Sequence, residues 1–192
     1  MHFQKKIGLA AALVMISVAS AYADEVSDAL QSASDAYAAG DLGKTSEAIV
    51  MARQALAKQQ SDLLTALLPE APDGFTRTLT EDFSQGFAMA GGGSGAEARY
   101  DSADGATSFT LSFVADNPMV ASMAAMLGNA QMMAMMGTVV KVGDTPLLQT
   151  DGNISGLLDA RVLFQAQGAG VDAMMPLVQQ IDFAKVASFD KK

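Results

Sequence analysis

Seven methionines lie within an 18-residue segment of the chain: Met119, Met123, Met126, Met132, Met133, Met135 and Met136. Met119, Met123 and Met126 recur at i, i+4 and i+7, which places their side chains on one face of a helix, and Met133 continues the row. Thioether sulfur is a soft ligand that suits Cu(I), so these three residues form a candidate metal site. Methionine is also an adaptable filler of cores and of apolar binding surfaces. The segment therefore has three interpretations: core packing, an apolar binding surface, or a site for a soft metal.

The same segment carries no charged side chain between Asn117 and Val140. Gly128, Asn129 and Gln131 interrupt the apolar run, and polar groups at the depth of a bilayer are costly. The flanks also lack the aromatic belt and basic cluster of a spanning helix. We therefore expect a buried helix here and no transmembrane helix in the mature chain.

Carboxylates are the other groups that could do acid–base chemistry. The candidates are Glu81, Asp82, Asp101, Asp104, Asp144 and Asp151. A carboxylate pair assembled by the fold could hydrolyse a glycosidic bond, which makes a carboxylate-based hydrolase one alternative function. None of the candidates follows the Asp-x-Asp-x-Asp-Gly pattern of a calcium loop. We expect them to be solvated surface groups.

Composition excludes most other active sites. The chain has no cysteine and no tryptophan, and its single histidine is His2. Catalytic Ser-His-Asp and Cys-His sets are therefore absent from the mature chain, as are ordinary zinc sites, thiolate-bound clusters and His-ligated haem. The glycine-rich segment 91–95 is expected to be a flexible loop, and its Ser94 has no histidine to activate it. Lys44 follows a glycine as in a P-loop, but Ala38 stands where the first glycine of that motif belongs. We expect no catalytic residue and no cofactor.

The first 23 residues have the pattern of a secretory signal peptide. Lys5 and Lys6 precede a short apolar run, and the segment ends on Ala21, Tyr22 and Ala23. We expect cleavage after Ala23 and a periplasmic mature chain. Loss of the two lysines from the 12 basic residues leaves ten against 21 acidic ones, a net charge of about −11. Such a chain repels the phosphate backbone, so we expect no nucleic-acid partner.

Residues 24–68 are predicted to form a helical hairpin. Apolar residues recur at helical spacing on both sides of residues 40–43, and Pro69 ends the second helix. The predicted apolar stripe consists of Val26, Ala29, Leu30, Ala33, Ala36 and Tyr37 on the first helix and of Ile49, Ala52, Leu56, Leu63, Leu64 and Leu67 on the second. The seam is rich in alanine, which allows a close approach of the two helices. Residues 36–41, with Glu47-Ala48 and Ala55-Leu56, resemble one tetratricopeptide unit, but the turn is longer than in that family and no second copy follows. We expect the hairpin to pack on the rest of the chain, because an isolated pair of helices would expose its apolar seam.

A proline-containing connector at 69–74 leads to residues 75–192, which are predicted to form an α+β domain. Alternating and apolar runs predict strands at 75–80, 96–101, 107–113, 138–142, 147–150, 154–159 and 162–167. Asp104 and Gly105 predict a tight primed turn. Helices are expected at 117–136, beginning at Asn117 and Pro118, and at 171–189 with a bend at Pro176. Short turns between strands predict a mainly antiparallel sheet.

The leading functional hypothesis is an exported, non-catalytic binding module. Its partner would be an unknown envelope protein or an apolar ligand. Two features support the hypothesis: the missing catalytic side chains and the large methionine-rich element, which could adapt to a ligand. The alternatives are copper or silver handling through Met119, Met123 and Met126, and a carboxylate-based hydrolase.

Overall fold

The computed structural model describes residues 18–88 and 91–191. They form two compact units, one ending at Leu56 and the other beginning at Ala57. Residues 1–17 of the predicted signal peptide lie outside the described residues. Residues 18–23 form the start of the first helix, α1 (Val18–Ala38). The boundary between the units falls inside the second helix, α2 (Leu42–Thr65).

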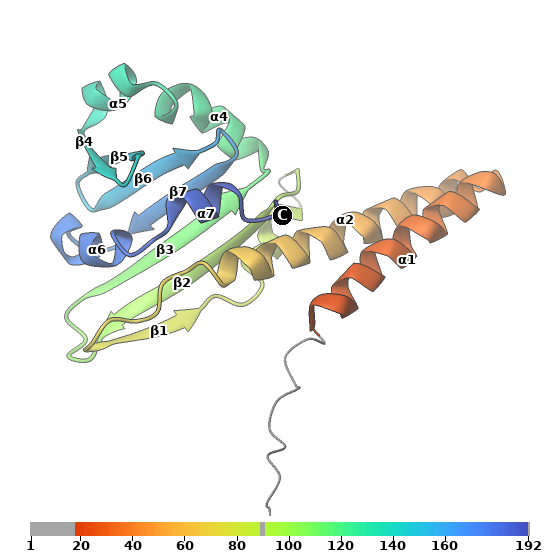
Figure 1. Cartoon of the computed structure of the whole chain (residues 1–192), viewed down its shortest axis with the longest axis horizontal. Helices are drawn as coiled ribbons and strands as arrows, with labels where there is room; N and C mark the ends of the chain where they lie inside the picture. Colours follow the sequence, from red (N-terminus) through yellow and green to blue (C-terminus); the bar gives the residue numbers. More distant parts are fainter. Residues whose placement is uncertain (1–17, 89–90, 192) are drawn as a thin grey trace, which may run out of the picture. The chain divides into compact units, whose positions relative to one another are not determined.

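The N-terminal unit contains α1 and the first part of α2, which form the predicted pair of helices (Figure 1). Gly40 takes a positive φ of 75° in the turn, and the Asp41 carboxylate accepts a hydrogen bond from the Lys44 amide at the start of α2. Ala33, Ala48 and Ala52 are buried, which confirms the alanine seam. The larger apolar residues expected on the same stripe do not lie in that seam. They are exposed on both helices: Leu30, Tyr37, Ile49 and Leu56.

The second unit contains a seven-stranded sheet, in which the order is β1-β2-β3-β7-β6-β5-β4 and every neighbouring pair is antiparallel (Figure 1). The strands are β1 (Phe75–Leu79), β2 (Ser94–Ser102), β3 (Ser108–Ala115), β4 (Thr138–Val142), β5 (Thr145–Thr150), β6 (Asn153–Leu158) and β7 (Val162–Gln167). The predicted α+β fold with an antiparallel sheet is confirmed. The pairing of β3 with β7 joins the N-terminal and C-terminal halves of the sheet.

Alternation along the strands divides the apolar side chains between the two faces of the sheet. Ala96, Ala98 and Tyr100 of β2 lie in the larger core, together with alternate residues of β3. On β3, Phe113 belongs to this core, whereas the next residue, Val114, belongs to a smaller core. Period 2 therefore predicted which residues of the β2–β3 hairpin face the larger core.

Helical segments cover both faces. Leu64 and Leu68, at and just beyond the end of α2, pack in the larger core with α6 (Val171–Val178) and α7 (Phe183–Ala187). The smaller core lies under α4 (Pro118–Leu127) and α5 (Ala130–Met136), which bury Val120, Leu127 and Met133. A short helix, α3 (Gln85–Ala88), was not predicted, and its Phe87 packs against the same core.

Two helices predicted as continuous are broken. The helix expected at 117–136 ends at Leu127 and restarts at Ala130, with a bend of 85°. Asn129 causes the restart, because its side chain accepts hydrogen bonds from the amides of Gln131 and Met132 and caps α5. The helix expected at 171–189 also divides, at 179–182, and Asp182 caps α7 by accepting from the Lys185 amide.

The β2–β3 hairpin is present, but its turn differs from the predicted two-residue primed turn. Ser102 donates its amide to the Thr107 carbonyl, so four residues form the loop. Within this loop only Gly105 takes a positive φ. A primed turn of the Asp-Gly type needs positive φ at both central residues, so that assignment was wrong. The glycine-rich segment expected as a loop at 91–95 also enters β2, at Ser94.

Candidate functional site

Four large apolar side chains are exposed on the methionine-rich helices, Met119 on α4 and the neighbouring Met132, Met135 and Met136 on α5, and we call these four residues the methionine surface. Met135 is 80% exposed, and the other three are between 43% and 44% exposed. Met133 faces the opposite way and is buried against the sheet. Core packing therefore accounts for the apolar residues on the side of these helices that faces the sheet. It does not account for the methionines on the exposed side, which are accessible to a ligand.

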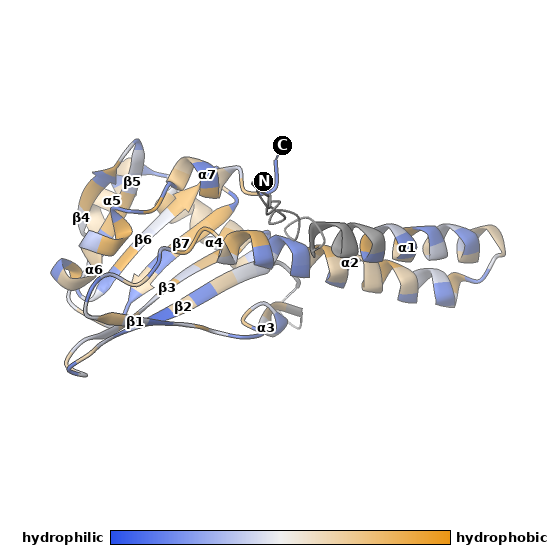
Figure 2. Cartoon of the chain, turned by 60° about the horizontal axis from the view of Figure 1, so that its bottom comes forward, coloured by the Kyte–Doolittle hydropathy of each residue, from blue (hydrophilic) through white to orange (hydrophobic). Residues whose placement is uncertain are grey.

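Two asparagine caps fix the backbone under this surface. The side-chain oxygen of Asn117 accepts a hydrogen bond from the Met119 backbone amide at 2.9 Å. Its side-chain NH2 group donates to the Gly92 carbonyl at 2.6 Å. Asn129 caps α5 in the same way. The helices are short, and their buried residues pack against the sheet. The backbone that carries the exposed methionines is therefore held in place by the core and by the two caps. Figure 2 shows the hydrophobic colouring of α4 and α5.

The predicted metal residues share one helix but not one environment. Met119 is exposed, whereas Met123 is half-buried and packs against the smaller core. Met126 is half-buried as well. The bend after α4 separates Met133 from the helical row that the sequence predicted. Among the described residues, there is no group of three or more His, Cys, Asp or Glu side chains that could hold a metal ion.

The length of the helices bears on the membrane interpretation. No single helix among the described residues is both long enough and apolar enough to cross a membrane. α4 and α5 together have the length and composition, but they are bent by 85°.

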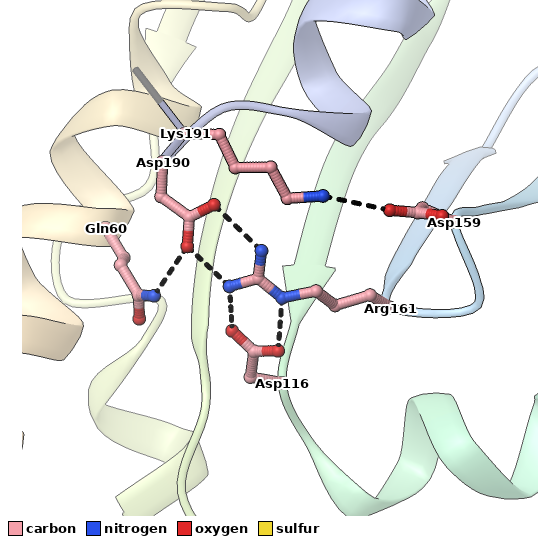
Figure 3. Close-up of polar contacts among 6 residues, drawn as sticks. All are labelled: Gln60, Asp116, Asp159, Arg161, Asp190 and Lys191. Atoms are coloured by element: carbon pink, nitrogen blue, oxygen red, sulfur yellow. Dashed lines mark hydrogen bonds and ion pairs between the residues drawn. The ribbon is translucent and has the colours of Figure 1, made fainter.

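Arg161 forms the most connected polar cluster in the described residues (Figure 3). Its guanidinium donates to both carboxylate oxygens of Asp116 at 2.7 Å and to both oxygens of Asp190. Gln60 donates to Asp190 at 3.1 Å, and the Phe189 ring lies 5.3 Å below the guanidinium carbon. Asp116 follows β3, and Arg161 follows a turn in which Asp159 and Ala160 both take positive φ. This cluster was not predicted from the sequence, because its members lie 29 and 45 residues apart in the chain.

The charges of this cluster favour a structural role. Hydrogen bonds donated by Arg161 lower the pKa of Asp190 to about 2, and the same guanidinium's hydrogen bonds to the carboxylates of Asp190 and Asp116 raise the pKa of Arg161. A carboxylate held ionised by an arginine is a poor general acid at neutral pH. The cluster therefore ties the C-terminal segment to the sheet and offers no acid–base pair.

The other carboxylate candidates are dispersed. Asp101 accepts from Ser108 and Arg99, and Asp104 accepts from Ser102 and the Ala106 amide, and these contacts lower both pKa values. Both side chains stabilise the β2–β3 hairpin locally. Glu81 and Asp82 precede α3, whereas Asp144 and Asp151 lie in the β4–β5 and β5–β6 turns.

Asp144 lies at a cavity of about 600 Å³ between the β4–β5 turn and α7. Asp159 and Asp182 also line it, and its apolar lining includes Leu157, Ile181 and Phe183. Asp182 is engaged in capping α7, and the Lys185 amide lowers its pKa. Asp159 pairs with Lys191 at 3.1 Å. Two of the three carboxylates therefore already have cationic or amide partners.

Ser94 is fully buried at the start of β2, and its hydroxyl has no hydrogen-bond partner among the described residues. The adjoining glycines let the backbone approach the end of β3: a Cβ on Gly93 would come within 2.8 Å of the Ala115 carbonyl oxygen. Gly93 also takes a φ of 118°. This segment is closely packed against β3 and Asn117, unlike the open loop that the sequence predicted.

Comparison with known proteins gave no match to any protein-family model, to any curated protein or to any solved structure.

Proposed function

We propose that this chain is an exported, non-catalytic binding module that holds a partner or ligand with an apolar face on the methionine surface. The observation that carries the proposal is the exposure of Met119, Met132, Met135 and Met136 on helices whose opposite side is anchored in the core. Soluble chains seldom expose a cluster of large apolar side chains without a use for it.

The chemistry of the surface fits an apolar partner. No charged residue occurs between Asn117 and Val140, so burial of this surface leaves no unpaired charge. Methionine side chains are unbranched and polarisable, and they can repack around ligands of different shape. Full burial of an exposed side chain of this size contributes about 1.5–3 kcal/mol. Met135 is 80% exposed and could contribute most of that amount, whereas the other three, at 43–44% exposed, would contribute less than half of it each.

A hydrolase finds less support in the described residues. The carboxylates with shifted pKa values are Asp101, Asp104, Asp182 and Asp190, and all four are shifted downward. A general acid that works near neutral pH needs the opposite shift.

Quantitative pull-down from an envelope extract tests the proposal. The bait is the chain in three forms: unchanged, Met135→Glu, and Leu79→Glu as a matched control. Leu79 is an exposed apolar residue on β1, and β1 is the strand at the opposite edge of the sheet from β4. A charge at Met135 would have to be desolvated on binding, so we expect at least about tenfold lower recovery of the partner.

The unchanged chain and Leu79→Glu should recover the partner equally. Equal recovery by all three baits would place the binding surface elsewhere. An extract that yields no reproducible protein or extractable apolar compound on the unchanged chain would remove the proposal.

A further inference from the structure

The helical hairpin exposes large apolar side chains at a regular spacing. On α2, Leu42, Ile49 and Leu56 follow one another at intervals of seven residues, and the sequence continues the interval to Leu63. On α1, Leu30 and Tyr37 are also seven residues apart. Tyr37 and Leu42 are each 68% exposed. Apolar residues repeated every seven positions are the pattern by which helices pack along a seam.

Helical geometry brings the two rows to one face of the hairpin. Each row lies roughly 70–80° around its helix from the buried alanine seam, at about 100° per residue. On each helix, viewed from its N-terminus, the row is rotated from the alanine seam in the same direction. Because the two helices are antiparallel and their seams face each other, both rows lie on the same side of the hairpin. We call this side the leucine face and define it by Leu30, Tyr37, Leu42, Ile49 and Leu56.

The leucine face has the composition of an interior surface. The same periodicity directs Glu25, Asp28 and Asp35 to the other side of α1. The large residues therefore occupy an outer face on which Arg53 is the one charged neighbour among the described residues of α2, while the buried residues between α1 and α2 are the small Ala33, Ala48 and Ala52. This distribution of sizes is typical of one half of a four-helix bundle, in which the leucine face would pack in the core against a counterpart.

We infer that the counterpart is the leucine face of a second copy of this chain. The exposed parts of the five side chains amount to roughly 100 Å² each, so two faces would bury about 1,000 Å², near the lower limit for a specific dimer. A two-fold arrangement sets the same patch of each copy against itself. The acidic side chains Glu25, Asp28 and Asp35 lie away from that contact, so it brings none of these carboxylates together.

Sedimentation velocity of the full chain, in the form that the cell produces and over a dilution series, tests the inference. Two matched pairs of variants separate the leucine face from the opposite side. Ile49→Glu is compared with Met51→Glu, two residues further along α2 and about 200° away around the helix. Leu30→Glu is compared with Ser32→Glu, which stand in the same relation on α1. All four positions are exposed, so far-UV circular dichroism should be unchanged.

We expect the unchanged chain to sediment at twice the monomer mass and to dissociate on dilution. Ile49→Glu and Leu30→Glu should each raise the dimer dissociation constant at least about tenfold. Met51→Glu and Ser32→Glu should change it less than about threefold. A chain that is monomeric at every concentration would overturn the inference, and so would equal effects within both pairs. The methionine surface is not involved, so this result is independent of the proposed function.

Discussion

Arg161 shows how single residues join distant segments of the α+β unit. Its guanidinium holds Asp116 after β3 and Asp190 near the C-terminus, and it lies over the Phe189 ring. Arg161 and Asp190 are 27% and 20% exposed, so solvent screens their interaction less than it screens a surface pair. Bidentate geometry adds to the strength of both contacts. No local pattern in the sequence predicts this cluster, because its members are distant in the chain.

Replacing Asp190 with asparagine should destabilise the α+β unit by about 1–2 kcal/mol at pH 7. The folded pKa of Asp190 is about 2, below the unfolded value, so its contribution is present above about pH 4 and is lost as the pH falls toward 2. Denaturant unfolding of both chains from pH 7 to pH 2 measures the difference. Asp159→Asn is the control, since its pair with Lys191 is exposed and should contribute less than about 0.5 kcal/mol. A difference that does not depend on pH would contradict the assigned ion pair.

Met119, Met123 and Met126 give a second prediction at this scale. We expect the chain to retain no Cu(I) against a competing chelator, because Met123 packs against the core and only Met119 is exposed. Retention of about one Cu(I) by the unchanged chain, lost when the three residues become leucine, would contradict this expectation and support the metal alternative. The three leucines should cost less than about 1.5 kcal/mol each, so folding is kept as the control.

Elements were predictable where their signals are local. The period-2 runs of β2 and β3 identified the hairpin and its buried side chains, and Asn117 followed by Pro118 located the start of α4. The break after Leu127 was missed, because glycine and asparagine each occur inside helices. Only contact with the sheet decides that Asn129 caps a new helix. The stripe predicted on α2 combined two faces for a similar reason: Leu64 is buried, whereas its neighbour Leu63 is 42% exposed.

Leu63 and Leu64, at the end of α2, provide a matched test of the difference between an exposed and a buried leucine on the same helix. Leu64 is fully buried in the larger core beside the sheet, so Leu64→Ala should destabilise the α+β unit by about 2–5 kcal/mol. Leu63→Ala should cost less than about 1 kcal/mol, since it removes little buried area. Thermal unfolding of the two variants measures both effects. Equal melting temperatures would mean that the end of α2 contributes nothing to this core.

At the scale of the whole molecule, the class of fold was predictable and the order of strands was not. Short turns indicated antiparallel neighbours along the chain, but the pairing of β3 with β7 joins residues about fifty positions apart. The methionine segment was predicted as a buried helix, and only the bent path of α4 and α5 over the sheet decides which methionines are exposed. Exposure is a property of the assembled unit, which explains why the sequence left three interpretations of this segment open.

Export gives the first prediction for the whole chain. We expect the intact mass of protein recovered from the periplasm to correspond to a chain that starts at Asp24, because residues 1–23 have the pattern of a cleaved signal peptide. A fraction of the chain that retains the first 23 residues would serve as the unprocessed reference. Recovery of only the unprocessed mass, or of protein confined to the cytoplasm, would contradict export.

Site-specific photo-crosslinking in intact cells tests the central claim most directly. A photoreactive amino acid at Met135 places the probe on the most exposed residue of the methionine surface, and the same probe at Leu79 provides the control. We predict a discrete crosslinked species from position 135 that is absent from position 79 and is lost when Met132 is changed to glutamate. Equal crosslinking at both positions, or no crosslinked species from position 135, would contradict binding at the methionine surface.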